Sequence, residues 1–259
     1  MVNVDFEWFD LDAEVDFHGL KSLLRQLLDV DSQLVDLSAL SDLILTQSWP
    51  MGSTVKVDGK ETDPYAILTM LSLHQFKDNA AVQQLVKYLI EKAQSNESLA
   101  QLASILSSPD SRVALLISER LINVPSEIVP PLYKMFVEEL PEALADDQPY
   151  NFSHYLVLSK TYQEITSTLD QEDAPRSKKN KAAKSKETFY FHPEDEAMHQ
   201  HALAYGNFEY TKDLGDAAAD SKRAFQDAGI KPQGHAILIE AGKFKDAVKA
   251  IGQYLNPGQ

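Results

Sequence analysis

The sequence predicts an α/β fold, a single domain in which a mixed central sheet is flanked by helices. Three observations lead to this prediction. Segments with the alternating pattern of strands are interleaved with segments of helical periodicity. Residues 66–73 are a nearly continuous apolar run that suits a strand covered on both faces, and residues 112–119 are the best candidate for a central strand. With 259 residues, of which 44% are hydrophobic, the chain can bury a large core.

The N-terminal half predicts strands and helices in alternation. Apolar and polar residues alternate in segment 2–9, as in a half-buried strand. Residues 15–28 place Leu20, Leu23, Leu24, Leu27 and Leu28 on one face of a helix. The next helix spans 36–46, with Asp36 or Ser38 as its N-cap. There follow a strand at 54–57 that ends in the Asp58-Gly59 turn, the strand 66–73, and helices at 79–94 and 98–106.

The C-terminal half continues the same alternation. After the strand 112–119, we expect a helix that begins after Pro130 or Pro131 and runs to residue 140. Aromatic and β-branched residues at 155–165 predict a long strand. The remaining predicted elements are a strand at 188–191, a helix at 193–204, a strand at 235–240 and a helix at 242–255.

Segment 170–187 has a different composition from the rest of the chain. It contains no aromatic residue, Val, Ile, Leu or Met, so it cannot bury enough apolar surface to offset the entropy of ordering. Only 72 residues follow it, which is few for an independent core, and strands are expected on both sides. We therefore predict a flexible basic loop that is inserted within one domain spanning 1–259.

The charge of the chain is strongly acidic and unevenly distributed. There are 39 acidic and 24 basic residues, a formal net charge of −15. Residues 176–187 hold six basic residues and one acid, a net charge of +5, so the rest of the chain carries −20. Such a surface repels the phosphates of nucleic acids and attracts basic proteins. The composition alone also allows a simpler interpretation, in which the charge only keeps the protein soluble.

Two groups of acids are candidate partner-binding sites. The first lies at the N-terminus and has no base among its members, Asp5, Glu7, Asp10, Asp12, Glu14 and Asp16. The second comprises Glu138, Glu139, Glu142, Asp146 and Asp147. Each group by itself also fits an ordinary solvated surface. On a strongly acidic chain, the two together favour a basic protein as the ligand, steered by long-range attraction.

A short cationic stretch predicts nuclear import. Lys178, Lys179 and Lys181 lie in the acid-poor loop and resemble the signals that nuclear import receptors bind. The alternative is a solvated linker. We favour the signal, and thus a nuclear location.

The sequence lacks the patterns of common catalytic and cofactor sites. It has no cysteine, which excludes disulfides, thiolate zinc sites and cysteine nucleophiles. Neither Gly59-Lys60 nor Gly242-Lys243 has the upstream glycine and the following Ser or Thr of a phosphate-binding loop. We therefore expect a protein that is not an enzyme and has no cofactor.

Histidines and carboxylates gather between His192 and His201, where they suggest a metal site. On a helix, however, His199 and His201 would point about 200° apart and could not share one ion. The acids at 194–196 fit the first turn of a helix, where the helix dipole favours negative charge. We therefore expect no metal at this cluster.

His18 allows two interpretations. It is either a base paired with Asp16 or a buried structural histidine. The second is favoured, because no nucleophile is recognisable nearby.

Five stretches of the sequence resemble the BCCIP family, whose fungal members are called Bcp. They are FEWFDL (6–11), VDFHGLKSLLRQLL (15–28), DLSALSDLIL (36–45), ISERLINVPSEIVPPLYKMFVEEL (117–140) and FHPEDE (191–196). The resemblance covers nearly all of the chain except 168–187 and 211–233, and identifies it as a fungal-type member. Family members typically begin with a long acidic segment. We therefore expect that this chain, which begins at VNVDF after Met1, lacks that tail.

The resemblance implies a nuclear protein with an acyltransferase-like (GNAT-type) fold and no acyl transfer. Fungal members are associated with ribosome biogenesis, as chaperones of a basic large-subunit ribosomal protein, and with nuclear export of a phosphatidylinositol-phosphate kinase. Animal counterparts bind a recombination mediator and a cyclin-dependent kinase inhibitor. A GNAT-type protein binds acetyl-CoA on a glycine-rich loop. The corresponding residues here, ERLINVPSE (119–127), contain a proline and no glycine, so we expect no acetyl-CoA site.

Three hypotheses follow for the function. The first is a nuclear escort chaperone whose acidic face neutralises a basic ribosomal protein. The second is an adaptor that docks several partners in an apolar groove near 117–140. The third is a residual acyltransferase.

Overall fold

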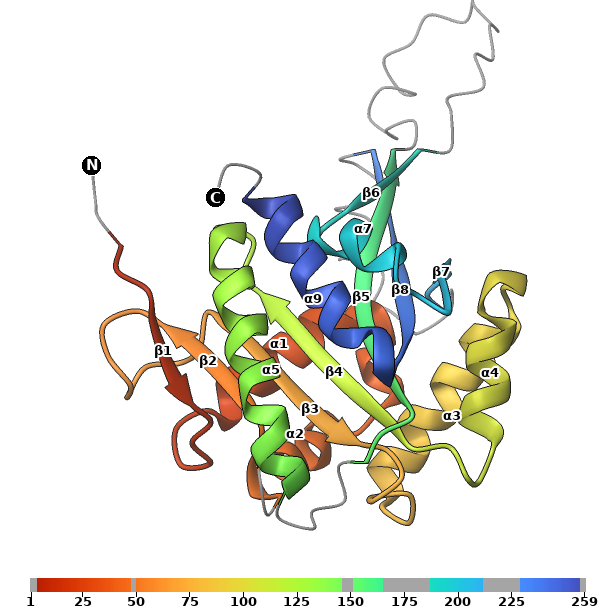
Figure 1. Cartoon of the computed structure of the whole chain (residues 1–259), viewed down its shortest axis with the longest axis horizontal. Coiled ribbons are helices and arrows are strands. Elements are labelled where there is room, and N and C mark those ends of the chain that lie inside the picture. Colours follow the sequence, from red (N-terminus) through yellow and green to blue (C-terminus); the bar gives the residue numbers. More distant parts are fainter. Residues whose placement is uncertain (1–3, 48–49, 146–150, 165–186, 212–228, 257–259) are drawn as a thin grey trace, which may run out of the picture.

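The computed structural model describes residues 4–47, 50–145, 151–164, 187–211 and 229–256, with side chains given for all of them except 141–145. Its centre is one mixed sheet in the order β1-β2-β3-β4-β5-β8-β7, with β6 paired to β5 (Figure 1). The strands are β1 (Glu7–Asp10), β2 (Gly52–Lys56), β3 (Ala66–Ser72), β4 (Val113–Arg120), β5 (His154–Glu164), β6 (Thr188–Tyr190), β7 (Ala204–Phe208) and β8 (Ile230–Glu240). β4 and β5 are parallel, and the other pairs are antiparallel.

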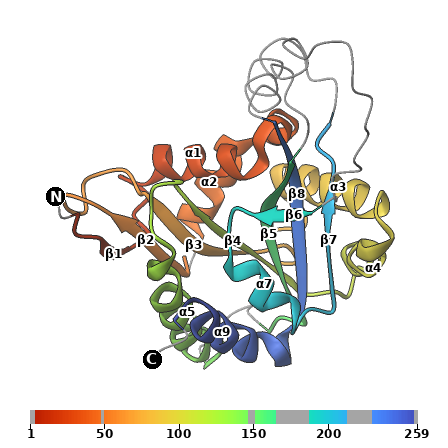
Figure 2. The same cartoon turned by 90° about the horizontal axis from the view of Figure 1, so that it is seen from above.

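Helices cover both faces of the sheet, which gives three layers (Figure 2). One face carries α1 (Phe17–Leu28), α2 (Leu37–Thr46), α3 (Ala80–Gln94) and α4 (Ala100–Ser107). The other carries α5 (Val129–Ala145), α7 (Glu194–His199) and α9 (Ala241–Leu255). Short 3₁₀ turns precede or follow them: η1 (Asp29–Leu34), η2 (Glu97–Leu99) and η3 (Ser126–Ile128). The predicted mixed sheet flanked by helices is confirmed.

The two central strands are covered on both faces, as their apolar runs predict. In β4, Leu115 and Ile117 pack with the helices of the α1 side, while Ala114 and Leu116 pack with those of the α5 side. Every residue of β3 is buried as well. Successive side chains of a strand point to opposite faces, so only a run of apolar residues can serve two helical layers at once.

The helix ends follow local chemistry. The Asp36 side chain accepts a hydrogen bond from the Ala39 N–H at 3.0 Å, which confirms it as the N-cap of α2. α5 begins at Val129, so Pro130 and Pro131 lie in its first turn instead of preceding it. A proline is tolerated there because the first N–H groups of a helix have no partner within it.

Three predicted elements have different bounds in the structure. Strand 2–9 is the shorter β1 at 7–10, and strand 235–240 is the longer β8 at 230–240. The predicted helix 193–204 ends at His199. Leu203 instead donates its N–H to the Leu238 carbonyl, and Ala204 begins β7, which covers the edge of β8. Pairing with the free edge of β8 thus places in a strand a residue that local periodicity predicts to be helical.

Strands on both sides of segment 170–187 belong to the same sheet. β5 precedes the segment, and β6 and β8, which follow it, both pair with β5. Within the described part of the chain, no helix is long and apolar enough to cross a membrane.

Candidate functional site

Exposed acids gather at the β1 end of the sheet. The antiparallel register sets Glu7 opposite Lys56 and Asp10 opposite Ser53, so the N-terminal acids lie beside β2 and the turn after it. That turn, residues 57–65, adds three exposed acids and one exposed base, Lys60. We call the exposed acids of this surface the acidic edge: Asp5, Glu7, Asp10, Glu14, Asp58, Glu61 and Asp63. The sequence analysis missed the last three, because only the pairing of β1 with β2 brings them to the N-terminal group.

Asp16 does not belong to this surface, which corrects its prediction as a partner-binding residue. Its side chain is fully buried and lies 2.6 Å from the Lys56 Nζ, itself 1% exposed. It also accepts the N–H of Asp12 at 2.8 Å. A buried carboxylate needs such a cation, and the pair ties the start of α1 to β2. His18 lies exposed beside the Phe17 ring, so the predicted buried histidine is wrong.

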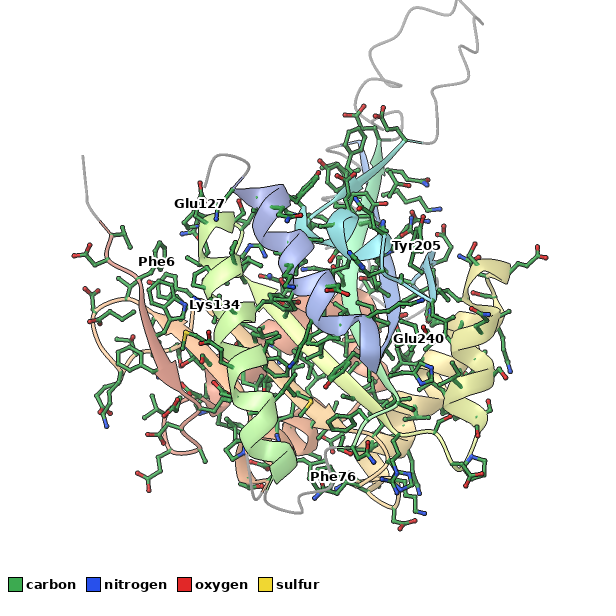
Figure 3. All side chains as sticks on the ribbon, in the orientation of Figure 1. Phe6, Phe76, Glu127, Lys134, Tyr205 and Glu240 are labelled. Carbon is green, nitrogen blue, oxygen red and sulfur yellow. The ribbon has the colours of Figure 1, made fainter. Side chains whose placement is uncertain are left out.

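The second acidic group reaches the same end of the sheet. The Gly52 N–H donates to a Glu139 carboxylate oxygen at 3.2 Å, and Gly52 precedes Ser53, the partner of Asp10. Glu138 is exposed and lies 3.9 Å from the Lys134 Nζ. Lys134 on α5 and Phe6 beside β1 lie on the same side of the molecule (Figure 3). The remaining predicted site residues lie outside the part of the chain that the structure describes. They are the Glu142 side chain, Asp146, Asp147 and the import-signal lysines Lys178, Lys179 and Lys181.

A network of buried charges joins the carboxyl ends of β4 and β5. The two strands pair with each other only as far as Ile117 and Leu158. Beyond this point, the Lys160 Nζ lies 3.0 Å from Glu119 Oε2, and the His192 Nε2 lies 3.2 Å from Glu119 Oε1. Side chains of opposite charge therefore bridge the two strand ends where the backbone ladder stops.

Further contacts extend this network to α1 and α7. Gln26 of α1 donates its Nε2 to Glu119 Oε1 and to the Arg120 carbonyl, both at 2.8 Å. The Arg120 guanidinium donates to both oxygens of Glu194, at 2.5 and 3.1 Å. Ser159 donates its hydroxyl to Asp195 at 2.6 Å. We call Glu119, Arg120, Lys160, His192, Glu194 and Asp195 the buried ion network.

Three of the stretches that carry the family resemblance meet in this network. Gln26 comes from 15–28, Glu119 and Arg120 from 117–140, and His192 from 191–196. The acids at 194–196 lie in a first helical turn, as the sequence predicts, but Glu194 and Asp195 are also buried. A sequence signal was present. Glu119 and Arg120 end a strand whose first five residues are apolar, and burial of their charges requires partners.

The surroundings set the protonation of the network. Burial alone would raise the pKa of Glu119, but the neighbouring His192 and Lys160 outweigh it and lower that pKa to about 2. Burial would lower the pKa of His192, yet the Glu119 carboxylate raises it. Burial raises the pKa of Asp195 to about 7. The network therefore keeps Glu119 ionised at neutral pH and shifts His192 toward its protonated form.

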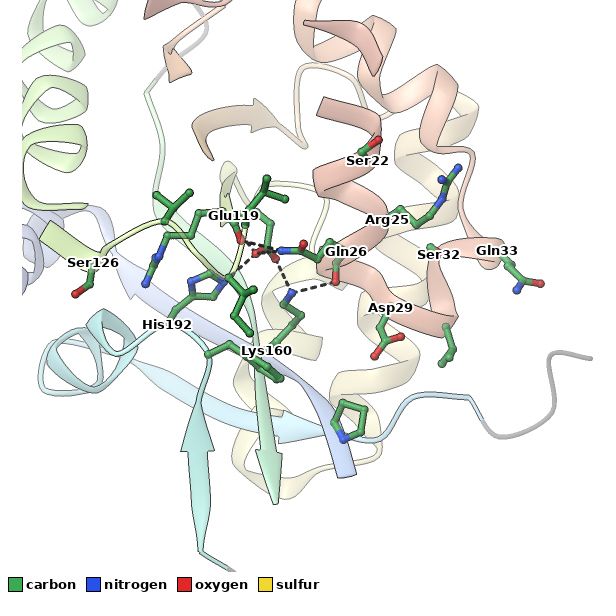
Figure 4. Close-up of a pocket in the computed structure, with 17 residues that line it drawn as sticks. Ser22, Arg25, Gln26, Asp29, Ser32, Gln33, Glu119, Ser126, Lys160 and His192 are labelled. Carbon is green, nitrogen blue, oxygen red and sulfur yellow. Dashed lines mark hydrogen bonds and ion pairs between the residues drawn. The ribbon is translucent and has the colours of Figure 1, made fainter. Parts of the chain in front are cut away.

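A cavity of about 740 Å³ lies over this network (Figure 4). α1 and η1 form one wall with Arg25, Gln26 and Asp29, and the loop after β4 forms another with residues 121–126. Glu119, Arg120, Lys160 and His192 contribute from the buried ion network. The charges within this network are largely paired with one another. Ser159, which donates its hydroxyl to Asp195 of the network, is buried and does not line the cavity.

The histidine-rich stretch does not form a metal site in the part of the chain described. No group of three or more ligand side chains comes together there. His199 Nε2 instead lies 2.9 Å from His235 Nε2, and the His235 Nδ1 lies 2.6 Å from the Asn207 side-chain oxygen. Burial lowers the pKa of His199 to about 4 and that of His235 to about 3, so both rings are neutral at pH 7.

The fold and these surfaces define an acidic, mixed α/β protein with the features of a binding protein. The BCCIP family matches residues 1–198 of the chain. Protein BCP1 of Gibberella zeae is 57% identical over 259 residues, which cover 100% of this chain and 89% of that protein. Protein bcp1 of Aspergillus fumigatus is 55% identical over 259 residues, with 99% and 89% covered. This chain therefore belongs to the BCCIP family, as its resemblance predicts.

A solved structure agrees with this assignment. The crystal structure of BCP1 from Saccharomyces cerevisiae is similar with a TM-score of 0.65 and 30% sequence identity, covering 96% of this chain and 88% of that one. The names of these relatives state no catalytic activity, and membership of the family is consistent with a non-enzymatic binding protein.

Proposed function

We propose that this protein is a non-enzymatic nuclear escort chaperone for a basic ribosomal protein of the large subunit, and that it takes part in nuclear export of a phosphatidylinositol-phosphate kinase. The proposal extends to a nuclear location with shuttling to the cytoplasm, and to contacts with nuclear transport factors. These roles are the ones that the resemblance of this chain to the BCCIP family implies.

The observation that carries the escort function is the acidic edge. It holds seven exposed acids with Lys60 as the exposed base among residues 4–17 and 57–65. An anionic surface of this kind attracts a cationic protein over a distance and covers charges that would otherwise bind nucleic acid. The client would thus be neutralised until ribosomal RNA replaces its escort.

The salt dependence of client binding tests this proposal. Coulomb attraction between exposed charges is screened over about 10 Å at 0.1 M salt and about 3 Å at 1 M. The affinity of the protein for a basic large-subunit ribosomal protein, measured by calorimetry, is therefore expected to fall steeply as salt rises. An affinity that does not change with salt would refute the electrostatic escort.

The cavity favours a second function, that of an adaptor for several partners. Its wall at 121–126 lies within the segment 117–140, where we expect an apolar groove. Binding to the apolar part of this groove would depend little on salt. Reversing the charges of Glu138, Glu139 and Glu142 would then leave partner affinity unchanged.

The GNAT-type fold is a further part of the proposal. It is supported by the parallel pair β4 and β5, which α5 connects in sequence and whose carboxyl ends no longer pair with each other. In this protein charged side chains of the buried ion network bridge those ends. We therefore propose that acyl transfer is absent. Calorimetry with acetyl-CoA is the test, and micromolar binding would revive the acyltransferase hypothesis.

A further inference from the structure

The cavity over the buried ion network has a lining of a different kind from the rest of the surface. Its apolar members are Val30, Leu121, Ile122, Val124, Phe191 and Pro232. The lining also holds uncharged groups that can bind a peptide backbone, Ser22, Ser32, Gln33 and Ser126. Apolar anchoring positions combined with amides and hydroxyls are typical of surfaces that bind an extended segment.

The balance of charge in the lining is opposite to that of the chain. Four basic side chains, Arg25, Arg120, Lys160 and His192, line the cavity, against the two acids Asp29 and Glu119. The whole chain, in contrast, has 39 acids and 24 bases. Glu119 lies between Lys160 and His192, and Glu194 behind the lining pairs with Arg120. The exposed Arg25 has no ion pair to another described residue, so its charge is available to a ligand.

The rim of the cavity indicates a macromolecular ligand. Ile122 is 92% exposed although it belongs to the cavity wall. A pocket for a small metabolite usually encloses its ligand and buries the apolar side chains that line it. An exposed isoleucine and an arginine without an ion pair in the lining of one cavity instead fit a site whose apolar rim is covered when a protein partner docks.

We propose that this cavity is a second docking site, and that its occupant is an extended partner segment that carries apolar and acidic side chains. An apolar side chain of the segment packs against Ile122 and the neighbouring apolar wall. A carboxylate pairs with Arg25. The inference rests on the adaptor function proposed for the same cavity. The site shares no residue with the acidic edge and selects the opposite charge, so it can hold even if the escort function fails.

Two synthetic peptides test the proposal by fluorescence anisotropy. They share one leucine pattern, with glutamates in the remaining positions of the first and lysines in those of the second. The glutamate peptide is expected to bind, although the protein is acidic. Arg25→Glu should weaken it roughly fivefold, since it replaces an attraction by a repulsion, and Ile122→Ser should weaken it by roughly the same factor. Both positions are exposed, so both variants should keep the fold, which circular dichroism checks.

The control is Arg112→Glu, which makes the same change of charge at an exposed arginine that does not line the cavity. It should leave binding of the glutamate peptide unchanged. Equal losses in Arg25→Glu and Arg112→Glu would overturn the proposal, because general repulsion would then explain both. Absence of glutamate-peptide binding, or displacement of that peptide by acetyl-CoA, would also overturn it. Binding of the lysine peptide reports on the acidic edge, and therefore separates a failure of the escort function from a failure of this site.

Discussion

At the scale of single residues, several buried ionised side chains of the described part of the chain have a partner of opposite charge from another element. Asp16 at the start of α1 meets Lys56 at the end of β2. Glu119 of β4 meets Lys160 of β5, and Arg120 meets Glu194 of α7. Removing one partner would leave an uncompensated charge in the core, which is strongly destabilising. Each pair therefore links elements that lie far apart in the sequence.

The variant Glu119→Gln tests the network through its dependence on pH. The pKa of Glu119 is lowered from 4.5 to about 2 in the folded protein. A lowered carboxyl pKa stabilises the fold above the unfolded value, and this stability is lost as the pH falls through the folded value. The stability advantage of the wild type over Glu119→Gln, measured by denaturant unfolding, should therefore shrink by about 3 kcal/mol from pH 4.5 to 2.

The matched control is Glu138→Gln, which removes an exposed carboxylate paired with Lys134. Its effect on stability should stay within about 0.5 kcal/mol over the same pH range, because exposed ion pairs contribute little. A constant difference between the wild type and Glu119→Gln at every pH would show that Glu119 is not stabilised as an anion by the fold.

At the scale of elements, neighbours in the sheet decide several boundaries. β7 begins where periodicity predicts the end of a helix, because β8 offers it a free edge. β2 begins at Gly52, whose φ of +108° is rarely adopted by other residues. A Cβ at Gly52 would lie 1.9 Å from the Leu68 carbonyl oxygen. Close backbone approach thus sets the start of β2, the strand that pairs with β1 beside the acidic edge.

Replacement of two glycines by alanine tests this role. Gly52→Ala is expected to destabilise the protein by roughly 3 kcal/mol or more, from backbone strain together with the clash against β3. Gly252→Ala in α9 meets open space and should stabilise by about 0.5–1 kcal/mol, because alanine favours the helix. Urea unfolding measures both. A Gly52→Ala protein within about 1 kcal/mol of the wild type would contradict the close approach.

At the scale of the whole molecule, the position of the charges matters as well as their sum. The acidic edge lies at the β1 end of the sheet, while α3 and α4 lie toward the opposite end (Figure 1). A basic client would be steered to the acidic edge by the local field. The cavity, with its basic lining, would draw a different partner. A chain with a net charge of −15 can thus offer two surfaces of opposite preference.

Association kinetics with the basic ribosomal protein test the steering. Reversing Asp10 and Glu14 to lysine should slow association about tenfold at low salt and change dissociation little, since long-range attraction acts mainly on encounter. The control reverses Glu97 and Asp110, which are exposed beside α4. It makes the same change in net charge, and should slow association less. Equal slowing in both variants, measured by stopped-flow fluorescence, would show that only the net charge matters.

The sequence by itself determined the features that depend on neighbours along the chain. Apolar periodicity located most helices and the central strands, Asp36 marked a helix start, and five stretches identified the family. Only the tertiary structure decided which charges are exposed and which are buried. In the sequence, Asp16 is one of several N-terminal acids, and only the structure shows that Lys56 of β2 lies against it. Gln26 likewise contacts Glu119, which is 93 positions away in the sequence. Charge pairing is a contact in space, so it depends on the path of the chain, whereas periodicity is set within a few residues.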